Sequence, residues 1–228
     1  MFRGTGPGAQ SDDGCSVELY RLLPYLGELD AIREFAWPGS TVLELGAGTG
    51  RLTRVLLDWG TIPTAVDSSN EMLAHIPAGV DRICSTIEVL DLSRTFDTVL
   101  LASCLINHPE KRVRQSFIQC AARHLRRGGR LILERHDPQW LLNAIPGRAA
   151  AAGPAVIFVE HVARTGGCIS MRLHYETQAH SWTQEFLVAA LGEQEIEREL
   201  AQLGFTDVSW HGPTRRLAVA LWENKDAN

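Results

Sequence analysis

Short apolar runs alternate with amphipathic stretches between residues 40 and 136. Strands are predicted at 41–45, 61–66, 80–84, 96–102 and 130–134. Helices are predicted at 51–59 and at 109–126. A further helix is predicted directly after Asp67, because Ser68 and Glu71 have the spacing of a capping box. This alternation is typical of right-handed βαβ units, and it predicts an open, mostly parallel sheet with helices on both faces.

The pattern changes in the last third of the chain, where little helix separates the apolar runs. Strands are predicted at 155–162, 168–176 and 181–189. In the middle strand Ile169, Met171, Leu173 and Tyr175 share one face, and polar residues occupy the other. Such alternation predicts an antiparallel layer with one buried side. A helix at 193–203 and a hairpin formed by 205–210 and 215–222 close the chain.

The N-terminal end predicts a flexible lead-in followed by a helical cap. Residues 1–14 are polar and rich in glycine, which is typical of an unstructured end. A short turn at 16–23 and helical spacing from 22 to 36 follow. A length of 228 residues suits one larger domain.

We therefore expect residues 15–228 to form that single domain. Its parts are a helical cap at 15–39, a ligand-binding core at 40–136, an antiparallel layer for a substrate or a dimer partner at 150–190, and the closing helix and hairpin at 191–228.

Composition and charge exclude several functional classes. A net charge of −5 is unfavourable for a protein held to nucleic acid by phosphate contacts. No apolar stretch approaches the roughly 20 residues of a membrane helix, and the N-terminus lacks the apolar centre of a secretory signal. The five cysteines form no CxxC pair and the eight histidines no HExxH, so neither disulfides nor a metal site is predicted. We expect a cytoplasmic protein without membrane or nucleic-acid partners.

A glycine loop follows the strand at 41–45. Gly46-Ala47-Gly48-Thr49-Gly50 has the spacing G-x-G-x-G, whereas the dinucleotide fingerprint requires G-x-G-x-x-G. Glu44, just before the loop, would repel a diphosphate and would suit an ammonium or a sulfonium. The next strand ends in Asp67, whose two oxygens can accept hydrogen bonds from both hydroxyls of a ribose. The site therefore fits an adenosine that carries an amino acid and no phosphates.

Four segments in this order and spacing resemble the class I S-adenosylmethionine-dependent methyltransferase family. They are VLELGAGTGRLT, AVDSSNEML, FDTVLLAS and HLRRGGRLIL. The resemblance covers roughly residues 40–136 and implies a Rossmann-like fold with a seven-stranded sheet. It implies S-adenosyl-L-methionine as cofactor and S-adenosyl-L-homocysteine as product. The implied contacts are Gly46, Ala47 and Gly48 with the methionine moiety, Asp67 with the ribose, Ser68 and Met72 with the adenosine, and Ser103 near the sulfonium.

The sequence departs from the family after the third strand. Many members have an aspartate there that reaches the adenine amino group, but this chain has Cys84-Ser85-Thr86-Ile87-Glu88. Thr86 or Ser85 is expected to accept that hydrogen bond, with Ile87 against the ring.

Candidate catalytic residues lie at the ends of the fourth and fifth strands. Methyl transfer requires a positioned acceptor and, where needed, removal of a proton. Histidine titrates near neutrality, so His108 and His136 are candidate general bases. Tyr20 is a candidate for the mouth of the cofactor site. Each has a structural alternative: His108 as a helix cap, His136 paired with Asp137 at the surface, and Tyr20 as packing.

The methyl acceptor is expected to be a small metabolite, such as a natural-product intermediate. Nucleic-acid amino methyltransferases carry an Asn/Asp-Pro-Pro-aromatic tetrapeptide after the fourth strand, and this chain has Ala102-Ser103-Cys104-Leu105. The antiparallel layer resembles that of small-molecule methyltransferases, including sugar N-methyltransferases that pair such strands in a homodimer. Oxygen, nitrogen and ring-carbon acceptors, an indole position among them, remain open. The alternatives are a nucleotide-dependent oxidoreductase and a non-catalytic protein that binds the cofactor.

Overall fold

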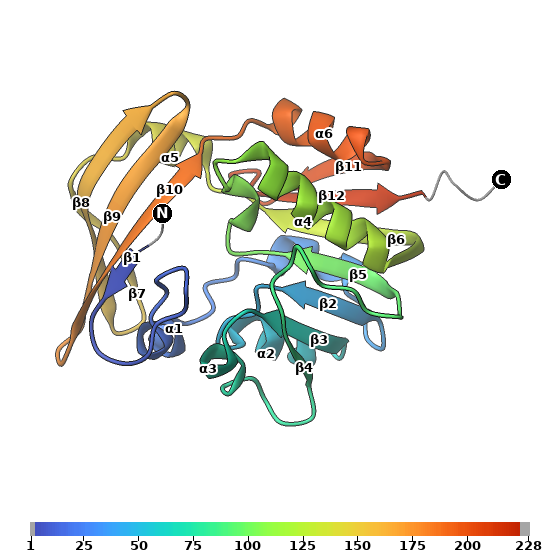
Figure 1. Ribbon diagram of the computed structural model, residues 1–228, viewed down its shortest axis with the longest axis horizontal. Helices are drawn as coiled ribbons and strands as arrows, with labels where there is room; N and C mark the ends of the chain where they lie inside the picture. Colours follow the sequence, from blue (N-terminus) through green and yellow to red (C-terminus); the bar gives the residue numbers. More distant parts are fainter. Residues whose placement is uncertain (1–2, 224–228) are drawn as a thin grey trace.

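Two β-sheets lie side by side in the computed structural model, which describes residues 3–223. The seven-stranded sheet has the order β11-β12-β6-β5-β2-β3-β4, and the five-stranded sheet has the order β1-β10-β9-β8-β7 (Figure 1). The first comprises β2 (Thr41–Leu45), β3 (Ile62–Asp67), β4 (Asp81–Cys84), β5 (Phe96–Leu101), β6 (Leu125–Glu134), β11 (Phe205–His211) and β12 (Leu217–Trp222). The second comprises β1 (Arg3–Thr5), β7 (Gly147–Ala152), β8 (Ala155–Thr165), β9 (Cys168–Glu176) and β10 (Ser181–Ala189).

Helices connect the strands; most of them cover the seven-stranded sheet, whereas α1 and α5 pack against the five-stranded sheet. They are α1 (Val17–Leu22), α2 (Arg51–Asp58), α3 (Asn70–Leu73), α4 (Lys111–His124), α5 (Pro138–Asn143) and α6 (Glu193–Gln202). Two 3₁₀ helices are η1 (Asp30–Phe35) and η2 (Leu105–Asn107). The predicted fold, a mostly parallel seven-stranded sheet with an added antiparallel layer, is confirmed.

The strand order reverses direction at β2. From β2 the chain moves to β3 and β4 on one side and returns to β5 and β6 on the other, and these strands run parallel. In open α/β sheets such a switch point opens a crevice at the carboxyl ends of the strands, where ligands bind. The glycine loop after Leu45 and the turn after Leu101 lie at that edge.

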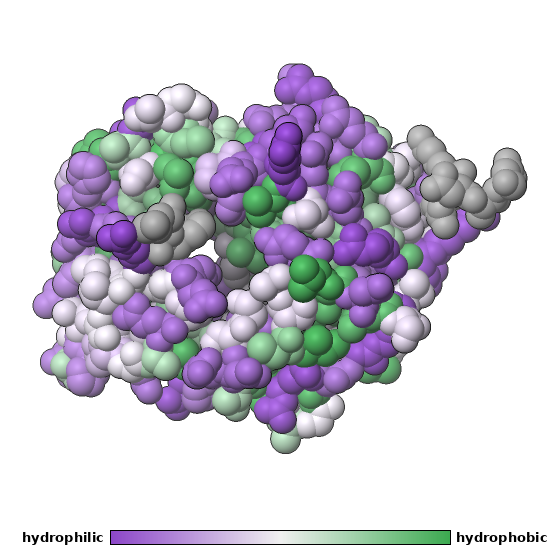
Figure 2. Space-filling view, viewed as in Figure 1, coloured by the Kyte–Doolittle hydropathy of each residue, from purple (hydrophilic) through white to green (hydrophobic). Residues whose placement is uncertain are grey.

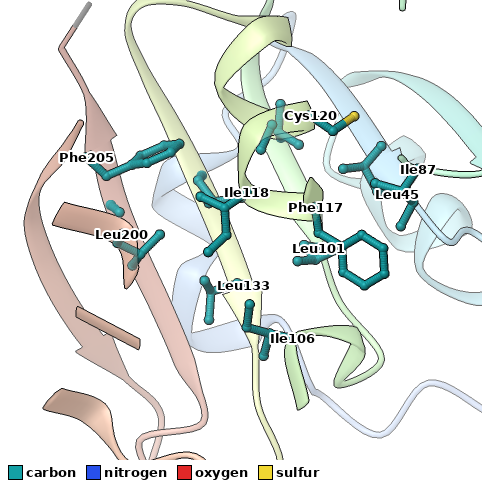
Figure 3. Packing of buried hydrophobic residues seen from close by; sticks show 14 of the residues in the cluster. Leu45, Ile87, Leu101, Ile106, Phe117, Ile118, Cys120, Leu133, Leu200 and Phe205 are labelled. Atoms are coloured by element: carbon teal, nitrogen blue, oxygen red, sulfur yellow. The ribbon is translucent and has the colours of Figure 1, made fainter. Parts of the chain in front are cut away.

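Apolar clusters on both faces hold the seven-stranded sheet rigid. Side chains alternate along β5, so that Leu101 faces α4 while Leu100 belongs to the cluster on the other face. Figure 3 shows Ile118 of α4 and Leu200 of α6 packed near Leu133 of β6. All five side chains are at most 1% exposed. This packing fixes the strand ends that carry the site.

A third cluster supports the five-stranded sheet. The predicted alternation in β9 is confirmed, because its four apolar residues are buried and the polar residues between them are not. Trp182 of β10, Leu19 of α1 and Leu141 of α5 complete the cluster. Helices α1 and α5 therefore connect this sheet to the chain segments beside the crevice at the carboxyl ends of the parallel strands.

The N-terminal predictions need correction. Arg3–Thr5, expected in a flexible lead-in, forms β1 and pairs with β10. The helix expected at 22–36 is reduced to η1, because side chains accept hydrogen bonds from backbone amides in the segment before it. The Leu26 amide donates to Glu28 at 2.7 Å and the Leu29 amide donates to the Tyr25 hydroxyl at 3.0 Å. Gly27, with φ of 85°, breaks the helical path.

Other element boundaries also differ from the predictions. The cap of α3 is Ser69, whose hydroxyl accepts a hydrogen bond from the Met72 amide at 3.2 Å, and not Ser68. Strand β6 begins at Leu125, immediately after α4. Strand β7 and helix α5 were not predicted, since the alanine run of β7 has no alternation and α5 is only six residues long.

Candidate active site

A cavity of about 920 Å³ lies between the carboxyl ends of the parallel strands and the inner face of the five-stranded sheet. Figure 2 shows the molecular surface hollowed between these two parts. The cavity is lined by every residue that the sequence analysis singled out: Tyr20, Glu44, Gly46, Ala47, Gly48, Asp67, Ser68, Met72, Thr86, Ile87, Ser103, His108 and His136. Residues far apart in the sequence are thus brought to one site.

The glycine loop needs its glycines for conformation and for space. Gly46 and Gly48 have φ of 75° and 56°, in the left-handed region that other residues rarely adopt. A Cβ on Gly46 would lie 2.6 Å from the Cδ1 atom of Leu105. The amides of Gly46 and Ala47 both donate to the Val66 carbonyl, which holds the loop against β3. The loop backbone therefore lies open toward the cavity.

Asp67 ends β3 and faces the glycine loop. Its Oδ2 accepts a hydrogen bond from the Gly48 amide at 2.8 Å, and its Oδ1 accepts one from the Ser69 amide at 2.9 Å. Burial raises the pKa of the Asp67 carboxyl, while these two amides lower it. Each oxygen keeps a further lone pair for a ligand hydroxyl.

Glu44 lies beneath the loop and is 2% exposed. Its Oε2 accepts a hydrogen bond from the Thr53 hydroxyl at 2.6 Å. Burial raises the pKa of Glu44 to about 7, and the Thr53 bond and the Arg51 charge offset only part of that rise. A cationic ligand in the cavity would favour the charged carboxylate, whereas a diphosphate would be repelled by it.

The turn after β5 is strained and is held by a carboxylate that the sequence analysis did not assign. Ser103 and Cys104 have φ of 55° and 58°. The Ser103 amide donates to Glu134 Oε2 at 2.9 Å, and Arg216 donates to Glu134 Oε1 at 2.6 Å. Burial raises the pKa of Glu134 and the Arg216 charge lowers it. Glu134 is the last residue of the predicted fifth strand, and this position could have marked it as a candidate site residue. Nothing in the sequence indicates that it pairs with Arg216.

The segment after β4 contributes Ser85, Thr86, Ile87 and Glu88 to the cavity lining. The Ser85 amide donates to the Asp67 carbonyl at 3.0 Å, and the Ser85 hydroxyl donates to the Thr86 carbonyl at 2.9 Å. Ile87 is 9% exposed and offers an apolar surface. Glu88 is a further acceptor that the sequence analysis did not select, although it lies two residues after Thr86.

His136 lies between two aromatic rings. Its ring centroid is 6.0 Å from that of Trp140 and 6.1 Å from that of Phe186, with interplanar angles of 25° and 11°. Burial, and to a lesser degree the Arg216 charge, lower the pKa of His136 to about 4. The imidazole is therefore neutral at pH 7, and its flanked faces leave the nitrogen-bearing edge for a ligand.

The pairing of His136 with Asp137 is not formed. Asp137 instead caps α5, accepting a hydrogen bond from the Gln139 amide at 2.8 Å. The His136 backbone amide donates to Asn107 Oδ1 at 2.8 Å. The side chain of Asn107 in turn donates to the Ala189 carbonyl at 2.8 Å. Asn107, fully buried, thus links the ends of β5, β6 and β10.

His108 has a structural contact as well as a place in the cavity. Its Nδ1 accepts a hydrogen bond from the Glu110 amide at 3.2 Å, beside the start of α4. The ring lies edge-on to Phe117, with centroids 6.4 Å apart. Burial lowers the pKa of His108. His108 therefore makes a structural hydrogen bond beside α4, but the predicted role as helix cap is wrong, because the N-cap of α4 is Glu110.

Tyr20 joins the N-terminal segment to β10. Its hydroxyl accepts hydrogen bonds from Cys15 Sγ at 3.2 Å and from Gln184 Nε2 at 3.3 Å. Its carbonyl accepts one from the Thr49 hydroxyl at 3.2 Å, next to the glycine loop. Burial raises the pKa of Tyr20, so the phenol stays neutral. Tyr20 therefore both packs and borders the cofactor end of the cavity.

The donor set fits an adenosine with a cationic amino-acid end. Asp67 offers two acceptor oxygens beside the open loop backbone, and Glu44 and Glu134 line the same cavity. These carboxylates disfavour phosphates and suit a sulfonium and an ammonium. Ile87 and Met72 supply apolar surface for a base.

An open parallel sheet with its switch point at a glycine loop defines a class of nucleotide-binding α/β proteins. Comparison with known proteins narrows the class. Residues 42–129 match the family described as a methyltransferase domain. A demethylmenaquinone methyltransferase from Corynebacterium urealyticum is 27% identical over 179 residues, which cover 78% of this chain and 72% of that protein.

Two solved structures have the same fold. A sugar N-methyltransferase from Streptoalloteichus has a TM-score of 0.72 at 20% identity, covering 96% of this chain and 98% of its own. An amino pentose methyltransferase from Micromonospora echinaspora has a TM-score of 0.65 at 21% identity, covering 80% and 83%.

Residues 42–129 therefore match a methyltransferase domain, and the chain has the class I methyltransferase fold. The family match and the relative support a methyltransferase over the oxidoreductase alternative. Within residues 3–223, no helix is both long and apolar enough to cross a membrane. The same residues contain no group of His, Cys, Asp and Glu side chains that could hold a metal ion.

Proposed function

We propose that this chain methylates an oxygen, nitrogen or carbon atom of a small metabolite that binds in the cavity between the two sheets. The supporting observation is that one cavity joins the glycine loop and Asp67 to the inner face of the five-stranded sheet. Its volume of about 920 Å³ is near the upper end for ligand pockets, so it has room for a cofactor and a small acceptor together. The demethylmenaquinone and sugar methyltransferases among the relatives support an acceptor of this size.

In this proposal the cofactor lies along the carboxyl ends of β2 to β5. Asp67 accepts hydrogen bonds from the ribose hydroxyls, with Ser68 and Met72 beside the adenosine. Thr86 and Ile87 face the adenine. The methionine end is bordered by Gly46, Ala47, Gly48 and Ser103, and Glu44 favours its positive charge.

When bound, S-adenosylmethionine supplies a methyl group activated by a sulfonium. The contribution of the protein is to orient the acceptor, exclude water and take up a proton. We keep His136 as a candidate proton acceptor because it lines the cavity. Its pKa of about 4 leaves the imidazole neutral at pH 7 but also makes it a weak base, so it suits a methyl acceptor that loses its proton readily. His108 and Tyr20 are secondary candidates, since each already makes a structural hydrogen bond.

Binding of S-adenosylhomocysteine to the full chain tests the cofactor assignment. At 100 times its dissociation constant the ligand adds about 2.7 kcal/mol to the free energy of unfolding, which raises Tm by roughly 5–10 °C. NADH should give no shift. Asp67→Ala should lose most of the shift, whereas Asp58→Ala, an exposed control at the end of α2, should keep it.

Methyl transfer itself is tested by mass spectrometry of small-molecule extracts incubated with enzyme and S-adenosylmethionine. We expect a product heavier by one CH₂ group, formed only with active enzyme. Binding of S-adenosylhomocysteine without any such product would contradict the proposed activity. A natural-product extract is the first choice, because an amino pentose methyltransferase of calicheamicin biosynthesis has this fold.

A further inference from the structure

The wall of the cavity formed by the five-stranded sheet carries no charged side chain among the described residues of β8 to β10. It presents Ile157, Leu173, Tyr175, Gln184, Phe186 and Val188. On the opposite face Arg172 forms an ion pair with Glu185 and His174 contacts Glu160. Arg164 of β8 lies on the inner side, where it donates hydrogen bonds to the Leu141 and Ala144 carbonyls, and it does not line the cavity. Because side chains alternate along a strand, the apolar wall and the charged outer face are parts of one pattern.

Among the residues of β8 to β10 that line the cavity, only Gln184 and Tyr175 have polar side chains, and the Gln184 amide already has hydrogen-bond partners. The Gln184 amide donates to Cys15 Sγ at 3.1 Å and to the Tyr20 hydroxyl at 3.3 Å, so the N-terminal segment holds it. Tyr175 is 7% exposed and lines the cavity. Within residues 3–223 its hydroxyl makes no hydrogen bond. A buried phenol normally has a partner, so this hydroxyl is available to a ligand.

Aromatic rings continue from this wall along the cavity. Phe186 of β10, His136 and Trp140 of α5 form a row whose planes are tilted by at most 25° between neighbours. All three line the cavity. Flat apolar rings pack well against such a row, whereas a sugar would bring several hydroxyls that this wall cannot satisfy.

We infer that the methyl acceptor is an uncharged, mostly apolar ring compound whose one hydrogen-bonding group is held by the Tyr175 hydroxyl. This inference rests on the proposed function and adds the acceptor class to it. Tyr175 is a specificity-determining residue in this arrangement. An apolar ring acceptor would differ from the sugar and amino pentose acceptors named for the methyltransferases that share this fold.

Calorimetry on the full chain saturated with S-adenosylhomocysteine tests the inference with three probes. These are 2-naphthol, naphthalene and glucosamine. We expect 2-naphthol to bind more tightly than naphthalene, and glucosamine not to bind. Tyr175→Phe should weaken 2-naphthol about fivefold and leave naphthalene unchanged, as expected for loss of one neutral hydrogen bond.

The control variant is Asp58→Ala, because Asp58 is exposed at the end of α2 and lies outside the cavity lining. It should leave all affinities unchanged. Unaltered S-adenosylhomocysteine affinity in Tyr175→Phe shows that this variant is folded. The acceptor class is overturned if the chain prefers glucosamine or binds neither aromatic probe. It is also overturned if Tyr175→Phe loses affinity for 2-naphthol and naphthalene equally. Failure of the wild-type chain to bind S-adenosylhomocysteine refutes instead the proposed function.

Discussion

Replacing His136 with phenylalanine should change how the stability of the protein depends on pH. The phenylalanine ring can keep the stack between Trp140 and Phe186, and the backbone hydrogen bond to Asn107 does not need the imidazole. The variant therefore removes a titrating group and preserves its packing. The pKa of His136 lies at about 4 in the folded protein, against an ordinary value of 6.5.

The sign and size of the effect follow from proton linkage. Because the folded pKa is lower, the unfolded chain binds more protons between pH 6.5 and 4, and folding stability is lost as pH falls through that window. Taking the two pKa values, the loss between pH 7 and pH 5 is about 2 kcal/mol. His136→Phe should be free of this loss, so it should be more stable than the wild type at pH 5 by about that amount relative to pH 7.

Glu44 provides an internal control of opposite sign. Its pKa is about 7 in the folded protein and ordinarily 4.5, so the folded state binds more protons and stability falls as pH rises from 4.5 through 7. Between pH 5 and pH 7 that fall is about 2 kcal/mol. In the wild type the two contributions nearly cancel, and Glu44→Gln should leave a stability that rises with pH.

Urea unfolding at pH 5, 6 and 7, followed by far-ultraviolet circular dichroism, measures both slopes. The quantity to compare between wild type and variants is the change in unfolding free energy from pH 5 to pH 7. The comparison requires the same m-value, the slope of the free energy against urea concentration, in each protein. The same pH slope in His136→Phe and wild type would refute the assignment of a neutral, desolvated imidazole.

Four further predictions follow from the site. Asp67→Ala should weaken S-adenosylhomocysteine binding by about 1.5–3 kcal/mol, measured by calorimetry, because charge-assisted hydrogen bonds are lost. His108→Ala should lower turnover and leave cofactor affinity nearly intact; an unchanged rate removes His108 from the mechanism. Gly46→Ala should reduce both Tm and cofactor affinity, since its φ of 75° and the Leu105 contact admit no Cβ. Asn107→Ala should cost about 1–3 kcal/mol in urea unfolding by leaving two buried backbone groups unpaired.

The parallel part of the fold was predictable because its signals are local. The strands β2, β3 and β5 are short apolar runs, and the helices α2 and α4 each carry one apolar stripe, so the period and order of these elements predicted them. The N-terminal segment was not predictable in this way. Leu22, Leu26 and Leu29 have helical spacing, but Gly27 and side-chain hydrogen bonds to the backbone override it. Strand β1 depends on pairing with β10, a partner far away in the sequence.

The candidate cofactor residues lie in the cavity because they follow predicted strands directly. Gly46, Asp67 and Ser103 each come at or just after the end of a parallel strand, and those ends share one edge of the sheet. Tyr175 and Phe186 could be assigned to an inner face by alternation, but no sequence rule says that this face closes the same cavity. That placement requires the relative position of two sheets, which only tertiary contacts determine.

In the proposed arrangement, cofactor binding and acceptor choice are carried by separate parts of this chain, and one buried residue connects them. Asn107 is 0% exposed and hydrogen-bonds to the backbone of both His136, after β6, and Ala189, at the end of β10. A buried amide with both ends satisfied fixes the distance between the strand ends that it joins. Side chains on the inner face of β8 to β10 can therefore change without moving the candidate proton acceptor. Acceptor preference should accordingly respond to Tyr175 and Phe186, while cofactor affinity responds to Asp67.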